Sequence, residues 1–233
     1  QRKIMKSKEA NLFQLITVAQ ALGDLLPHVT FVGGSTTLLL VDESAHFGIR
    51  KTDDIDVIVD VTTLVEYQRF SQKLRKLGFR EDKEGPICRW LLYSGVGKVK
   101  LDVMPVDEKI LGFSNRWYKD AINKAAETSL PDGTEIRVVS PAYFIATKFE
   151  AFTGRGQGDF FSHDLEDIVF IMENRNGLLL ELMDSPDELK SYFAEQARLL
   201  LNDDFLNVLP GLLNNSDSAQ AIENSLNIMS SWA

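Results

Sequence analysis

The 233-residue sequence has few residues suited to covalent or metal cross-links: one cysteine, Cys88, and three histidines. A single cysteine excludes an internal disulfide framework, and His46 and His163 lack the spacing of metal ligands. The apolar runs are short, far below the roughly 20 residues that a membrane span needs, and no signal-peptide pattern is visible. We therefore expect a cytoplasmic protein that does not associate with membranes.

Acidic charge is unevenly distributed. Residues 1–140 hold 20 Lys and Arg against 19 Asp and Glu, whereas residues 141–233 hold 5 against 15. The first part mixes strand and helix patterns, and the second is almost wholly helical in pattern. We expect an α/β domain over 1–140 and a helical domain over 141–233. The near-neutral first domain can still bind a polyanion through local basic clusters.

Two glycines and a serine, Gly33, Gly34 and Ser35, interrupt the apolar stretch FVGGSTTLLL. A strand pattern precedes them over 28–32, and residues 35–44 have a helical pattern with Ser35 as the expected N-cap. A tight turn alone would account for two successive glycines. A phosphate group that approaches the main chain at a helix start would account for it equally well. The acidic residues that follow favour the second explanation.

Three aspartates lie on two expected strands. In DDIDVIVDV, alternation of Ile and Val on one face fixes Asp54 and Asp56 on the other. The segment ICRWLLYSGVGKVKLDVMP predicts a hairpin, which places Asp102 on a neighbouring strand. Three such carboxylates can hold two Mg²⁺ ions about 4 Å apart for phosphoryl transfer. Each feature taken singly is more often turn chemistry or ordinary strand charge, but their order along the chain favours a metal site with two Mg²⁺ ions.

This order of elements resembles the nucleotidyltransferase superfamily related to DNA polymerase β. GGSTTLLL followed by RKTDDIDVIVD is similar to the AbiEii family of abortive-infection and toxin–antitoxin nucleotidyltransferases, which includes the MenT toxins. The segment KFEAFTGRGQGDFFSHDLEDI resembles that family's second conserved block. The resemblance spans about residues 30–175. One departure is the 18 residues between Ser35 and Asp54, so that the loop 42–53 has no assigned role.

The resemblance implies an α+β fold: a mixed sheet flanked by helices, with the C-terminal helical domain closing a nucleotide cleft. It implies transfer of a nucleoside monophosphate from an NTP to an acceptor hydroxyl, with the tRNA 3′ end as acceptor. The protein would be a toxin with a separate antitoxin protein. Two rival functions keep part of this chemistry: transfer of AMP to a protein side chain, and an inactive module that binds a nucleotide or partner protein.

The resemblance adds site residues from its second block to those of the first domain. Lys148 would neutralise the leaving group, and Asp167 would be a second catalytic residue of the helical domain. Lys148 and Arg155 share a helix face at i and i+7, although a purely structural pairing of Lys148 with Asp164 or Asp167 is an equal alternative. The expected nucleotide-binding residues are Gly33, Gly34, Ser35, Arg50 and Arg155, and the expected catalytic residues are Asp54, Asp56, Asp102, Lys148 and Asp167.

Overall fold

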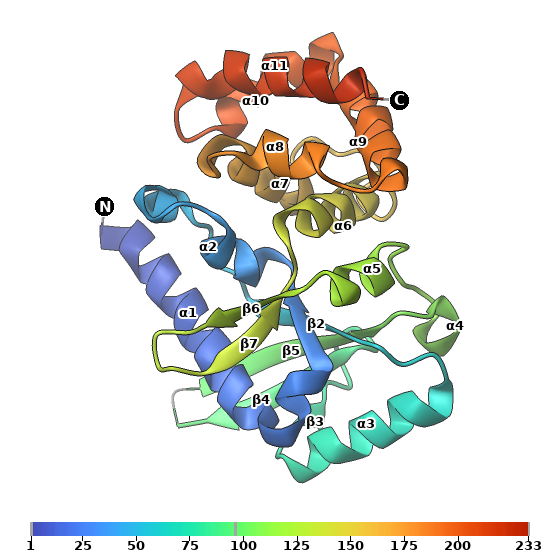
Figure 1. Cartoon of the computed structure of the whole chain (residues 1–233). Coiled ribbons are helices and arrows are strands. Elements are labelled where there is room, and N and C mark those ends of the chain that lie inside the picture. The colour runs from blue at the N-terminus through green and yellow to red at the C-terminus, as the bar shows by residue number, and fades with distance from the viewer. Residues whose placement is uncertain (1, 96, 233) are drawn as a thin grey trace. The chain divides into compact units, whose positions relative to one another are not determined.

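A computed structural model describes residues 2–95 and 97–232, and its internal contacts divide the chain into two compact units (Figure 1). Unit 1 comprises Gln1–Leu39 and Ile49–Ser140, and unit 2 comprises Leu40–Gly48 and Pro141–Ala233. The segment Leu40–Gly48, which we expected in the first domain, therefore belongs to the second unit. Val96 of the expected hairpin turn lies outside the described residues.

Unit 1 is built on a seven-stranded mixed sheet, which confirms the expected α+β class. The two central strands, β2 and β5, run parallel, as do β1 and β7, and the other neighbours run antiparallel. In spatial order the strands are β3 (Arg80–Glu81), β4 (Arg89–Ser94), β5 (Gly97–Pro105), β2 (Asp54–Val59), β1 (Val29–Val32), β7 (Glu135–Val138) and β6 (Ala126–Ser129).

Strand β2 follows its sequence pattern. Ile55, Val57 and Val59 are buried on one face, and Asp54 and Asp56 are half-buried on the other. The helices of this unit are α1 (Arg2–Leu22), the 3₁₀ turn η1 (Gly23–His28), α3 (Leu64–Lys76), α4 (Glu108–Leu111) and α5 (Tyr118–Asn123).

The helix expected over 35–44 is much shorter. The chain forms one 3₁₀ turn, η2 (Gly34–Thr36), and then one turn of helix, α2 (Thr37–Leu40). The hydroxyls of Thr36 and Thr37 donate to the carbonyls of Gly33 and Gly34 at 2.8 and 2.7 Å, which tightens this turn. Ser35 lies inside the 3₁₀ turn, so its assignment as N-cap was wrong.

Unit 2 consists of helices together with the segment 40–48, which contains the 3₁₀ helix η3 (Glu43–Gly48). The guanidinium of Arg175 donates to the Leu40 carbonyl at 2.7 Å, and the Asn176 amide donates to the Asp42 carboxylate at 3.1 Å. These bonds hold the segment in unit 2. The helices are α6 (Pro141–Thr153), α7 (His163–Asn174), α8 (Leu178–Met183), α9 (Asp187–Leu200), α10 (Asp203–Leu212), η4 (Ser216–Ser218) and α11 (Ala219–Ser230).

Over residues 2–95 and 97–232, the structure contains no helix with both the length and the apolar character needed to cross a membrane.

Candidate active site

The structure brings the three predicted metal-binding aspartates onto adjacent strands of unit 1. In the parallel pairing of β2 with β5, Asp56 lies beside Asp102, and Asp54 lies beside Lys100. Neighbouring strands are about 4.8 Å apart, and residues two apart on a strand share a face. Asp102 is buried, with 7% of its surface exposed. The three carboxylates therefore gather on one face of the sheet centre.

Arg89, on β4, binds two of these carboxylates. Its Nε and Nη2 atoms donate to Oδ1 and Oδ2 of Asp102, both at 2.8 Å, and Nη2 also donates to Oδ2 of Asp54 at 2.6 Å. The hydrogen bonds to Asp102 raise the pKa of Arg89 further above its already high value, while burial opposes the rise. The guanidinium is therefore a permanent positive charge within the aspartate cluster.

The sequence analysis missed Arg89, although the hairpin pattern contained it. Ser94 pairs with Gly97 across the turn, and the same register places Arg89 opposite Asp102. Counting residues outward from the predicted turn would have located this cation beside the predicted metal ligand.

The donor set fits Mg²⁺, which prefers carboxylate oxygens. As the side chains lie in the structure, none of the described residues form a group of three acidic, histidine or cysteine side chains that could hold a metal ion. A nitrogen of Arg89 lies between Asp54 and Asp102 instead, at bonding distance from both. The carboxylates thus already bind a cation at this position, and that cation belongs to the protein.

Gly33 lies against the same site. Its φ of +73° is a conformation that L side chains rarely adopt, and a Cβ atom there would overlap with the Asp56 carboxylate. The absence of a side chain at Gly33 therefore allows the Asp56 carboxylate to lie close to the backbone. Next to it, Ser35 is fully buried, and its hydroxyl has no hydrogen-bond partner among the described residues.

Replacing Gly33 by alanine should destabilise the protein and displace Asp56. Gly112→Ala is the matched control, because Gly112 also has a positive φ, of +84°, but has open space where a Cβ would lie. The backbone strain, about 1–2 kcal/mol, should be common to both variants. We expect a larger loss of unfolding free energy for Gly33→Ala in urea denaturation. Equal losses would show that Asp56 moves aside freely.

Arg50 lies on a segment that helix α1 holds in place. The side chain of Asn11, fully buried, donates to the Arg50 carbonyl at 2.8 Å and accepts from the Thr52 amide at 3.0 Å. These two bonds fix the backbone that leads into β2 and its aspartates.

Asn11→Ala should therefore lower the free energy of unfolding by about 2–3 kcal/mol, since the buried Thr52 amide and the half-buried Arg50 carbonyl lose their partners. The control is Gln20→Ala on the same helix, whose exposed side chain donates to Asp132 and should contribute little. Thermal denaturation of both variants tests this, and similar melting temperatures would contradict it.

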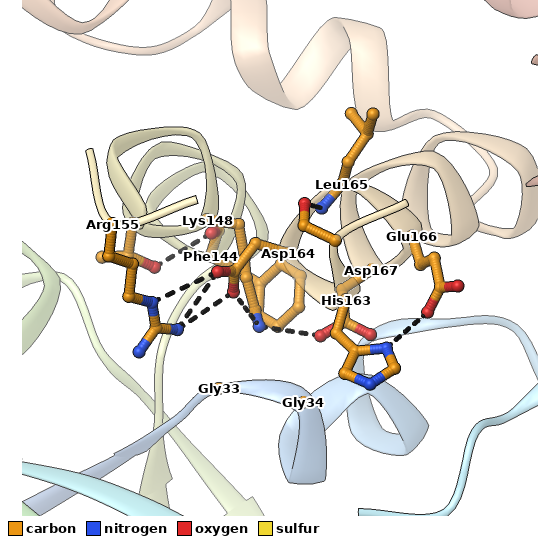
Figure 2. A network of polar contacts seen from close by, with 12 residues as sticks. Gly33, Gly34, Phe144, Lys148, Arg155, His163, Asp164, Leu165, Glu166 and Asp167 are labelled. Atoms are coloured by element: carbon orange, nitrogen blue, oxygen red, sulfur yellow. Dashed lines mark hydrogen bonds and ion pairs between the residues drawn. The ribbon is translucent and has the colours of Figure 1, made fainter. Parts of the chain in front are cut away.

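Unit 2 carries the second set of predicted residues: Lys148 on α6, Asp164 and Asp167 on α7, and Arg155 in the turn that follows α6 (Figure 2). Because α6 ends at Thr153, the helix face that we expected Lys148 and Arg155 to share stops before Arg155. Lys148 Nζ lies 2.9 Å from Oδ1 of Asp164 and 2.7 Å from Oδ2 of Asp167. Arg155 Nη2 lies 3.1 Å from Oδ2 of Asp164. The side chain of Lys148 is 10% exposed and that of Arg155 is 76% exposed, so Arg155 is the cation of the pair that solvent reaches.

Electrostatic interactions favour the charged forms of Asp164 and Lys148. Burial alone would raise the pKa of Asp164, but Lys148 and Arg155 outweigh it and hold that pKa below its usual value. Burial alone would lower the pKa of Lys148, yet Asp167 and Asp164 raise it overall. The contribution of Asp164 to stability is present above its ordinary pKa and is lost as pH falls below it.

The mixed sheet and the helical unit define a nucleotidyltransferase-like fold. A crystal structure of an antigenic nucleotidyltransferase-like protein from Paracoccidioides brasiliensis is similar to this chain, with a TM-score of 0.54 and 19% sequence identity over 87% of this chain and 93% of that chain. No protein-family model and no curated protein matches the sequence. The likeness shows the fold, and the resemblances to the polymerase β superfamily and to AbiEii proteins stay predictions.

Proposed function

We propose that the protein is a Mg²⁺-dependent nucleotidyltransferase, which transfers a nucleoside monophosphate from an NTP to an acceptor hydroxyl. The observation that carries this proposal is the cluster of Asp54, Asp56 and Asp102 on adjacent strands of a nucleotidyltransferase-like sheet. In the transfer, the acceptor oxygen bonds to the α-phosphorus, the bond from that phosphorus to the bridging oxygen breaks, and pyrophosphate leaves.

The three aspartates would hold the divalent cations. Bound Mg²⁺ would polarise the phosphate oxygens and neutralise the charge that develops on them. Asp102, the most buried of the three, would also help to remove the proton of the acceptor hydroxyl. Asp54 and Asp56 complete the negatively charged face to which the cations bind.

The triphosphate contacts in this proposal come from the glycine turn and from cationic side chains. Gly34 and Ser35 would bind the β- and γ-phosphates. The buried hydroxyl of Ser35, which has no hydrogen-bond partner among the described residues, supports this role. Arg50 would neutralise phosphate charge. For the residues of unit 2 we propose the roles that the resemblance to AbiEii proteins implies: Arg155 as a nucleotide-binding cation, and Lys148 and Asp167 as catalytic residues.

For the acceptor we propose the 3′ end of tRNA, as the resemblance to AbiEii proteins implies. The protein would then act in the cytoplasm as the translation-blocking toxin of a toxin–antitoxin system, with its antitoxin a separate protein.

The test is incorporation of each α-³²P-labelled NTP, with Mg²⁺, into total tRNA and separately into total cell protein. We expect label in tRNA from the wild type and none from Asp54→Asn. Label in protein would replace tRNA as the acceptor and favour AMP transfer to a protein side chain. No label in either fraction, with NTP binding intact, would overturn the proposed transfer to these acceptors and favour a binding module.

A further inference from the structure

Arg89 occupies the position where the proposed function, on which this inference rests, needs a metal ion. We propose that Arg89 is the built-in counter-cation of the aspartate site: it holds Asp54 and Asp102 in the metal-free protein and competes with a divalent cation for them. Three hydrogen bonds of 2.6–2.8 Å connect the guanidinium to the two carboxylates. Its side chain is 15% exposed, so these bonds are largely shielded from water.

Geometry makes the contact specific. The fork of Arg89 matches both oxygens of Asp102, the arrangement in which an arginine–carboxylate pair is strongest. The cross-strand register of β4 and β5 fixes this match, because Arg89 and Asp102 are directly paired residues. The strand pairing, and not the free rotation of a surface side chain, therefore brings Arg89 to Asp102.

Competition follows from the atoms involved. A Mg²⁺ ion binds carboxylate oxygen at about 2.0–2.1 Å and needs the lone pairs that now accept from Arg89. Two cations at the same oxygens also repel each other. A divalent cation that takes Asp54 and Asp102 must therefore displace the guanidinium or break part of its contacts.

Charge explains why such a residue is useful. Asp54, Asp56 and Asp102 place three negative charges on one face of the sheet, and unpaired they would repel each other. Arg89 offsets one of these charges before any metal ion arrives. The three aspartates can then stay ordered in the metal-free protein. In return, the site binds a divalent cation less tightly.

The experiment is a titration of the metal-free protein with Mn²⁺, followed by electron paramagnetic resonance, without nucleotide. Arg89→Gln should bind Mn²⁺ about tenfold more tightly than the wild type, the effect of releasing roughly one charge-assisted hydrogen bond. Its metal-free melting temperature should fall, and Mn²⁺ should restore it. Arg89→Lys keeps the charge but loses the fork, and should lie between the two.

Lys100→Gln is the matched control. It also removes one positive charge beside Asp54, the residue opposite it in the β2–β5 register, but the hydrogen bond to the Asp54 carboxylate comes from Arg89. Its Mn²⁺ affinity should change much less. Equal tightening in both variants would reduce the effect to general electrostatics and overturn the inference.

Two further outcomes also overturn it: Mn²⁺ affinity in folded Arg89→Gln that equals or falls below that of the wild type, and no Mn²⁺ binding by any variant. The Mn²⁺ readout needs no acceptor or NTP. Failure of nucleotidyl transfer with the expected Mn²⁺ behaviour would therefore overturn the proposed function and leave the role of Arg89 supported.

Discussion

Asp56→Asn should lower the rate of nucleotidyl transfer about 10³-fold, which corresponds to about 4 kcal/mol of transition-state stabilisation. Asp56 lies beside Asp102 at the centre of the sheet, and asparagine keeps its size while removing the charge that a divalent cation needs. The fold should persist, because the substitution adds no bulk next to Gly33. Single-turnover assays with labelled NTP give the rate, and circular dichroism checks the fold.

Asp60→Asn is the control for this prediction. Asp60 directly follows the same strand, but its carboxylate is exposed and pairs with Lys119 at 2.6 Å. Removing its charge should leave the transfer rate nearly unchanged. A loss of similar size in both variants would place the effect in the general charge of unit 1 and refute the assignment of Asp56.

Lys148→Met should cost about 3–5 kcal/mol of unfolding free energy, the largest stability effect we expect. The ammonium is the shared partner of Asp164 and Asp167 in the interior of unit 2, and its removal leaves two buried carboxylates with less compensation. Methionine fills much of the same volume, so the loss comes from charge rather than from a cavity. Urea denaturation followed by circular dichroism measures it.

A surface lysine provides the comparison. Lys190 pairs with Asp187 at 2.9 Å on α9, but the Asp187 side chain is 94% exposed, so water screens the pair. Lys190→Met should leave the urea midpoint almost unchanged. If Lys148→Met were equally mild, the cluster would tolerate loss of its central charge, and its role would have to lie in substrate contacts.

Local sequence patterns predicted the elements that carry the candidate site. Strand β2 alternates β-branched residues with Asp54 and Asp56. This period of two in the sequence matches the structure, because one face of the strand is buried in the core. The hairpin of β4 and β5 was predicted from its turn residues. Strands β3 and β6 were missed because they are short, polar and mostly exposed at the sheet edges.

Other features depend on contacts between distant residues. The helix after Ser35 ends early, and the chain beyond it is bound by Asn174 and Arg175, more than 130 residues away. Nothing in the segment 40–48 itself indicates that destination. The side-chain network of Lys148 was foreseen only as an alternative, because helical spacing shows which residues share a face but not which partners on α7 meet them.

The attachment of Leu40–Gly48 to unit 2 has a consequence for biosynthesis. This segment leaves the ribosome about a hundred residues before Pro141, the first residue of the remaining part of unit 2. Domains generally fold from the N-terminus as they are synthesised. The sheet of unit 1 can therefore assemble before Asn174 to Asn176, which bind this segment, have been synthesised. A chain truncated to residues 141–233 would lack the Leu40 carbonyl that accepts from Arg175 and the Asp42 carboxylate that accepts from the Asn176 amide. Unit 2 is thus complete only when both of its segments, Leu40–Gly48 and Pro141–Ala233, are present.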